Sequence, residues 1–154
     1  MLIHFKKDFD NNFTLHCVRV DGTETFHKYK TGSFQIEHDL MHFVVEKRLG
    51  YTKAFYGIVA SGKDIDWFAE RTPAGKSQGK EVMHGEAEAV ELIVGTLQTL
   101  RNDAEFFDHL NRIITPENRD FLSITQEQVI VVRKEVSNLL DQWQNSKEGI
   151  TLVF

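Results

Sequence analysis

The spacing of apolar residues changes near residues 31–33, and this change constrains the fold more than any other feature of the sequence. Before it, three short segments of alternating character are separated by turn residues at 10–12 and 21–22. After it, apolar residues recur about every 3.6 positions, as they do on one face of a helix. The first third of the chain is therefore predicted to form an antiparallel β-meander, and the rest to be mostly helical.

The expected elements follow from these periods and from the residues that begin and end them. Strands are predicted at 2–7, 13–20, 23–29 and 150–154, and helices at 35–49, 52–60, 81–100, 104–114 and 125–145. Asp21 and Gly22 predict a two-residue type I′ hairpin turn. Gly149 is expected to end the last helix, and residues 73–80 to form a loop. We expect an α+β fold in which an N-terminal antiparallel β-ribbon or meander, joined by the C-terminal strand, packs on a bundle of about four to five helices.

Composition and charge are those of a single intracellular domain. The 154 residues are close to the common domain size, and no linker divides residues 1–154. A net charge of −5 without a run of like charges argues against a nucleic-acid or anionic-membrane partner. The apolar runs are far shorter than the roughly 20 residues of a membrane span, and residues 1–10 lack the apolar core of a signal peptide. We therefore expect a cytoplasmic protein.

The single cysteine and the many phenylalanines are interpreted as packing residues. Cys17 stands at an apolar position of a predicted strand, which favours a buried thiol over a nucleophile. The twelve Phe residues predict a core rich in aromatic rings. Such a core can also line a pocket for a small-molecule ligand or form the surface of a homodimer.

The predicted helix at 35–49 carries the most chemically distinctive residues of the chain. His38, His42 and Glu46 follow one another at four-residue spacing and fall at about 0°, 40° and 80° on a helical wheel. Asp39 lies at about 100°. Apolar residues fill much of the remaining circumference, so this helix is expected to be buried on most sides. Buried polar groups need partners, which predicts either a bound metal ion or a hydrogen-bond network.

Helix geometry limits how these residues share an ion. Two histidines at i and i+4 can converge on one cation. His38 and Glu46, in contrast, are about 12 Å apart along the axis. Glu46 is therefore expected to contact His42, either as an acceptor that fixes its tautomer or as a ligand to a second ion. Asp39 and Glu46 are the predicted catalytic residues, as orienting group or proton carrier.

The missing ligands are expected from the helix predicted at 81–100. Its polar stripe consists of Glu81, His84, Glu88 and Glu91. Di-metal carboxylate bundles normally use two copies of the Glu-x-x-His spacing, and only one is present here. The most economical site is mononuclear, with His38, His42 and either His84 or Glu88 holding a divalent zinc or iron ion and leaving a position for water or substrate. The alternative is that this stripe is a solvated helix face.

The sequence HDLMH, residues 38–42, resembles several known motifs. In the zinc-protease signature a glutamate follows the first histidine as general base, whereas the shorter Asp39 stands here, which argues against proteolysis. HDLMH also resembles the HDxxH element of the helical family associated with ubiquinone biosynthesis, in which a glutamate follows at a fixed distance. Ala54 occupies that position here. The stretch 38–62 resembles an uncharacterised group of small bacterial proteins with an HDLxHxxVE core, which implies no known activity.

Two interpretations of function stay open. In the first, the protein is a metal-dependent enzyme or metal-binding protein that uses the His38/His42 pair. In the second, it is a non-catalytic ligand-binding or dimeric interaction module, in which the histidines are structural and bond to backbone carbonyls or to Glu46. The residues around 75–77 do not form a phosphate loop, and no serine stands in the strand-turn-helix context of a Ser/His/Asp hydrolase.

Overall fold

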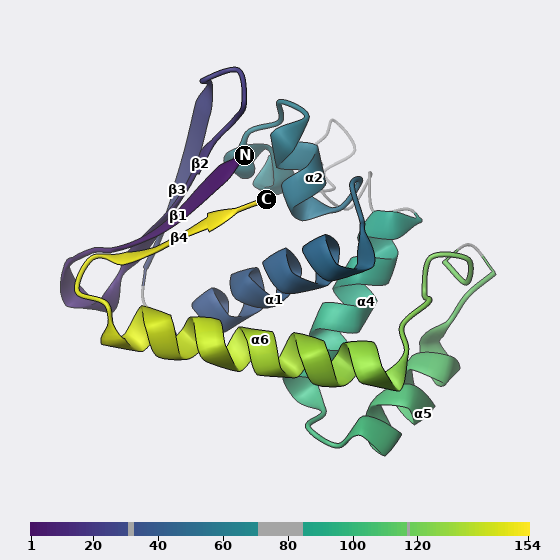
Figure 1. Ribbon diagram of the computed structural model, residues 1–154. Coiled ribbons are helices and arrows are strands. Elements are labelled where there is room, and N and C mark those ends of the chain that lie inside the picture. Colours follow the sequence, from purple (N-terminus) through teal and green to yellow (C-terminus); the bar gives the residue numbers. More distant parts are fainter. Residues whose placement is uncertain (31–32, 71–84, 117) are drawn as a thin grey trace.

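The structure, a computed structural model, describes residues 1–30, 33–70, 85–116 and 118–154. These ranges contain one four-stranded antiparallel sheet and five α-helices, with the sheet over one side of the helices (Figure 1). The strands are β1 (Leu2–Lys7), β2 (Phe13–Val18), β3 (Glu24–Tyr29) and β4 (Gly149–Val153). The α-helices are α1 (Ser33–Leu49), α2 (Phe55–Ala60), α4 (Glu86–Thr99), α5 (Asp103–Ile113) and α6 (Gln126–Asn145), and short 3-10 helices cover Phe9–Asn11 and Ile65–Ala69. The predicted α+β class is confirmed.

The sheet joins the two ends of the chain. Its strand order is β3-β2-β1-β4, so the predicted pairing of the C-terminal strand with the N-terminal meander is confirmed. β4 runs antiparallel to β1, with Phe5 opposite Ile150. The N-terminal amine of Met1 donates a hydrogen bond to the carbonyl of Phe154 at 2.9 Å. The alternation of β1 and β2 buries residues such as Ile3, Phe5, Leu15 and Cys17 on one face.

The hairpin between β2 and β3 differs from the predicted type I′ turn. Gly22 has a φ of 84°, but Asp21 does not have the positive φ that the first central position of that turn requires. Instead the Gly22 amide donates to the Arg19 carbonyl at 3.1 Å, and the Arg19 amide donates to the Thr23 carbonyl at 2.8 Å. The Arg19–Thr23 bond therefore encloses three residues instead of the predicted two, and the flanking strands end at Val18 and begin at Glu24.

Helix α1 crosses the middle of the molecule and contacts α2, α4 and α6 (Figure 1). Every side chain from Asp39 to Glu46 is buried. The prediction that this helix is buried on most sides is thus confirmed. Gly50, with a φ of 73°, follows its last residue, in the left-handed conformation expected after a helix. The polar residues Asp39, His42 and Glu46 consequently lie among packed side chains.

Helix α6 begins and ends close to the predicted bounds, but the residue predicted to end it does not do so. The Thr125 side chain accepts from the Gln128 amide at 3.2 Å, and the Gln128 side chain accepts from the Thr125 amide at 2.8 Å, which completes the capping box. The helix ends at Asn145 with Ser146 as its C-cap, so Gly149 does not end it. Gly149 instead starts β4, where a Cβ would lie 1.8 Å from the Phe5 carbonyl oxygen.

Two predicted features lie wholly or partly outside the described residues. These are the loop at 73–80 and the first part of the helix predicted from residue 81, which is described as α4 from Glu86 onward. In the part of the chain that is described, none of the helices combines the length and apolarity needed to cross a bilayer.

Cys17 is expected to be unreactive in the native protein. Its thiol is fully buried on the inner face of the sheet, and burial raises its pKa to about 12. Because the thiolate is the reactive form, a colorimetric disulfide reagent at pH 8 should modify Cys17 only after unfolding in guanidinium chloride. Rapid stoichiometric labelling of the native chain would show instead that the thiol is accessible.

Candidate metal centre

Helices α1 and α4 bring together two histidines and a carboxylate. His38 and His42 lie one turn apart on α1, with their ring centroids 4.7 Å from each other. Glu91 reaches them from α4. One ligand atom from each of these three residues lies within 4.8 Å of the others. The predicted His38/His42 pair therefore does face the following long helix, and this group could hold a metal ion.

His42 lies between two carboxylates. Its Nδ1 is 3.4 Å from Glu46 Oε1, and its Nε2 is 3.4 Å from Glu91 Oε1. Burial by itself lowers the pKa of His42, but the hydrogen bonds and negative charges of Glu46 and Glu91 outweigh it and raise this pKa to about 10. With this pKa the ring carries a proton on both nitrogens at neutral pH when no ion is bound. An ion at Nε2, which faces the other members of the group, would displace the proton there, and Glu46 would then accept the remaining proton of Nδ1.

Glu46 is fully buried and connects α1 to α2. Its Oε2 accepts hydrogen bonds from the backbone amides of Tyr56 at 2.9 Å and Gly57 at 3.3 Å. These amides belong to the first turn of α2, which has no side-chain cap of its own. Burial raises the pKa of Glu46, and the bonds from His42 and from the two amides oppose that rise. One carboxylate therefore accepts the amide protons at the start of α2 and also contacts His42.

His38 has an analogous outer partner. Its Nδ1 lies 3.2 Å from Oε1 of Gln98 on α4. The Gln98 amide nitrogen donates to the carbonyl of Phe34, also at 3.2 Å, which leaves Oε1 as the acceptor that faces His38. Burial lowers the pKa of His38, and the charge of His42 lowers it further, against the opposing effects of Gln98 and Glu91; the net shift favours the neutral imidazole. A neutral ring that donates from Nδ1 has its lone pair on Nε2.

The chemistry of the group fits one transition-metal ion. Ligand atoms around a tetrahedral ion with bonds of about 2.1 Å lie about 3.4 Å apart. The 3.4 Å between His42 Nε2 and Glu91 Oε1 matches that spacing. The remaining pairs, within 4.8 Å, need to close by at most about 1.4 Å. Two imidazoles and one carboxylate are an accepted ligand set for zinc and for non-haem iron.

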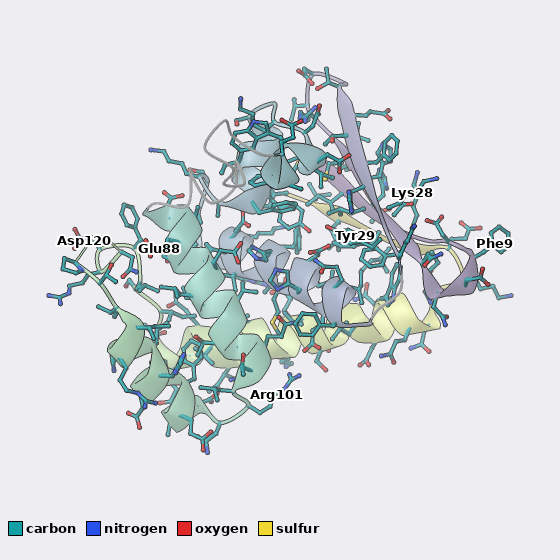
Figure 2. The ribbon with its side chains drawn as sticks, turned by 180° about the vertical axis from the view of Figure 1, so that it is seen from behind. Phe9, Lys28, Tyr29, Glu88, Arg101 and Asp120 are labelled. Carbon is teal, nitrogen blue, oxygen red and sulfur yellow. The ribbon has the colours of Figure 1, made fainter. Side chains whose placement is uncertain are left out.

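The other residues predicted for the site, Glu88, His84 and Glu46, have different outcomes. Glu88, which Figure 2 shows on α4, is not among the residues whose ligand atoms converge; Glu91, three residues later in the same stripe, is. His84 lies outside the described residues. The contact predicted between Glu46 and His42 is confirmed.

Asp39 is buried beside groups other than the metal-ligand group. Its Oδ1 accepts from Gln35 Nε2 at 2.8 Å. The side chain of Tyr29, which belongs to β3 and is labelled in Figure 2, also lies beside this carboxylate. Burial raises the pKa of Asp39 to about 6, although the bond from Gln35 and the charge of His42 act to lower it. The carboxylate is therefore set apart from Glu91 and is not one of the three converging residues.

Two contributors were not singled out from the sequence. Glu91 belongs to the acidic stripe from which Glu88 was selected, and the wheel positions of the two are too similar for the sequence to separate them. Gln98 lies seven residues after Glu91, which places it on the same face of α4, and that spacing was the available signal.

Comparisons with family models, with curated proteins and with solved structures find no match to this chain.

Proposed function

We propose that this protein binds one divalent zinc or iron ion through His38, His42 and Glu91, and that it is a metal-dependent enzyme. The observation that carries the proposal is the combination of three converging ligand atoms with an outer acceptor on each histidine. Outer acceptors of this kind orient imidazole ligands and raise their basicity in metalloproteins. Glu46 and Gln98 fill that role here.

The number of ligands favours a catalytic ion over a structural one. Structural zinc sites are usually closed by four protein ligands, whereas catalytic sites use three and keep a position for water or substrate. Three ligands converge among the described residues, and the Glu91 side chain is 39% exposed, so solvent reaches the site. A bound ion would act as a Lewis acid or would lower the pKa of a water molecule. Gln98 and Glu46 hold the two histidines in place, and the packing around the buried His42 excludes water from that part of the site.

Metal analysis of variants tests the proposal directly. Protein purified without a histidine tag and loaded with zinc or with ferrous iron should retain close to a stoichiometric amount after gel filtration. His42→Ala and Glu91→Gln should retain a negligible amount, because each removes one of three ligands. Glu88→Gln is the matched control, since it alters a carboxylate of the same helix outside the converging group, and it should retain metal like the wild type. Inductively coupled plasma mass spectrometry gives the content.

A structural role for His42 is the second candidate, and the buried Glu46–His42–Glu91 arrangement favours it. An imidazolium between two carboxylates satisfies its own hydrogen bonds without an ion. In that case His42→Ala should lower the free energy of unfolding by about 1–3 kcal/mol and leave the metal content equal and negligible in both proteins. Equal metal content would therefore refute the metal site and support the structural one.

A further inference from the structure

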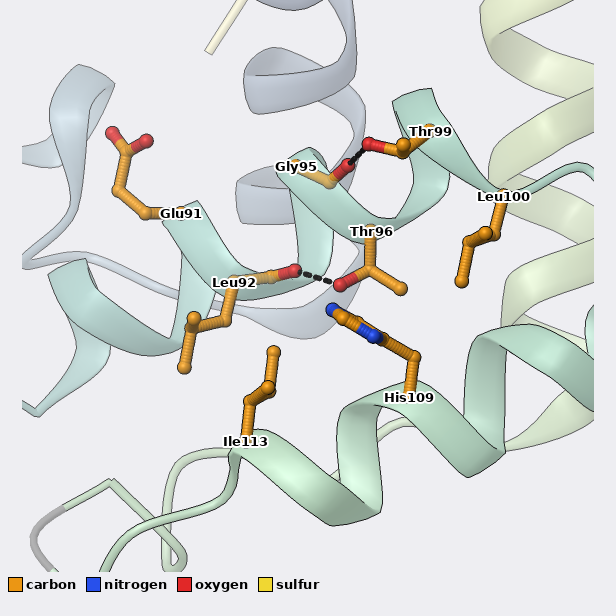
Figure 3. A pocket seen from close by; sticks show the side chains of 8 residues that line it. All are labelled: Glu91, Leu92, Gly95, Thr96, Thr99, Leu100, His109 and Ile113. Carbon is orange, nitrogen blue, oxygen red and sulfur yellow. Dashed lines mark hydrogen bonds between the residues drawn. The ribbon is translucent and has the colours of Figure 1, made fainter.

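A pocket of about 310 Å³ lies between α4 and α5, and Glu91 is one of its lining residues (Figure 3). The other residues that line it are Leu92, Gly95, Thr96, Thr99, Leu100, His109 and Ile113. Glu91 thus belongs both to this pocket and to the group that converges with His38 and His42. In Figure 3 the Glu91 carboxylate points away from Leu92 and Ile113, so the candidate metal centre lies beyond the edge of the pocket, across the surface of α4.

The pocket wall is mainly apolar. The Thr96 hydroxyl donates to the Leu92 carbonyl at 2.6 Å, and the Thr99 hydroxyl donates to the Gly95 carbonyl at 2.5 Å, as the dashed lines in Figure 3 show. The helix backbone therefore accepts both hydroxyl protons, which are not available to a ligand. His109 points from α5 towards Thr96 in the same view. Its ring makes no hydrogen bond to any residue that the structure describes, so it is one polar group of the lining that a ligand can contact.

Gly95 lies in the interior of α4, and neither packing nor backbone conformation explains a glycine there. A Cβ at Gly95 would meet no atom within 4 Å, and its φ is not positive. Glycine weakens a helix interior relative to alanine. Gly95 is one turn after Glu91, and its missing side chain leaves the surface of α4 open between Glu91 and the pocket. The glycine at this position therefore keeps the helix surface free of a side chain.

We propose that the α4–α5 pocket binds the aliphatic tail of a small substrate whose oxygen-donor head group binds the metal ion. This inference rests on the proposed function, because the ion holds the head group. The tail has to cross one helical turn at Gly95, about 6 Å, before it lies against Leu92 and Ile113. The substrate class is therefore a short-chain amphipathic molecule with a metal-binding head, and its recognition depends on chain length.

Hydroxamates of increasing length test this. Hydroxamate is a general metal-binding head group, so the zinc-loaded protein is titrated calorimetrically with acetohydroxamate, hexanohydroxamate and octanohydroxamate. Burial of each added methylene improves affinity by up to about fourfold. We expect Kd to fall by at least about tenfold from the shortest to the longest probe. Gly95→Leu fills the opening, so its Kd for octanohydroxamate should rise to the value for acetohydroxamate.

A matched control and the zinc content separate the outcomes. Ala104→Leu places the same leucine side chain at an exposed position of α5 outside the pocket, and it should retain the dependence on chain length. Bound zinc with a Kd that does not change with chain length overturns this inference alone. A dependence that persists in Gly95→Leu also overturns it, because the tail then binds elsewhere. A protein that binds no zinc loses the proposed function, and this inference with it.

Discussion

Replacing Glu46 with alanine is expected to lower the free energy of unfolding by about 3–5 kcal/mol, the usual cost of removing one partner from a buried charge pair. The change removes the acceptor for the amides of Tyr56 and Gly57 and the partner of His42 Nδ1. All of these groups are buried, so water does not replace the lost bonds. Urea denaturation followed by circular dichroism gives the free energy.

Replacing Glu46 with glutamine is expected to separate its two roles. A glutamine oxygen can still accept from the two amides, so the loss of stability should be smaller than with alanine. Its amide group, however, donates towards His42 Nδ1, which moves the imidazole proton to Nε2. Because Nε2 is the nitrogen that faces Glu91, we expect affinity for zinc to fall about 10- to 100-fold, as for other outer partners of metal ligands.

Glu88→Ala is the control for these variants, since Glu88 lies outside the converging group. Its free energy of unfolding should change by less than about 0.5 kcal/mol. A Glu46→Gln protein that binds zinc as tightly as the wild type would contradict the role of Glu46 in fixing the His42 tautomer. A Glu46→Ala protein of wild-type stability would contradict its role at the start of α2.

Gly57→Ala is expected to disrupt the packing between α2 and the segment that precedes it. A Cβ at Gly57 would lie 2.0 Å from the carbonyl oxygen of Thr52, far inside van der Waals contact. The Thr52 segment cannot easily move, because Glu86 accepts hydrogen bonds from the amides of Thr52 and Lys53 at 2.8 and 2.7 Å. We expect a loss of about 2–4 kcal/mol in the free energy of unfolding.

The same change should also weaken metal binding, because a displaced α2 moves the amides that hold Glu46. Gly95→Ala is the matched control: it adds the same methyl group to a helical glycine with open space around it. It should raise the free energy of unfolding by about 0.4–1 kcal/mol. Equal stability of the Gly57→Ala and Gly95→Ala proteins would show that residues 52–57 do not pack as described.

Local features of this protein follow from the sequence because they depend on residues close together in the chain. The change of period predicted the meander and the helices, and the Thr125/Gln128 spacing predicted the start of α6. The interval from His38 to His42 is one helical turn, so their common face follows from backbone geometry alone. The same geometry excludes a single ion shared by His38 and Glu46. The structure agrees, because Glu46 contacts Nδ1 of His42, the nitrogen that faces away from the ligand group.

Features that join distant segments depended on the tertiary structure. Glu88 and Glu91 share a stripe of α4, and only the register of α4 against α1 selects Glu91. The bonds from Glu46 to the start of α2 depend on how the chain turns after Gly50. A helical wheel gives the direction of a side chain about its own axis but not the offset between two packed axes. The sequence by itself therefore determined the elements and the histidine pair, and helix packing decided which carboxylate completes the site.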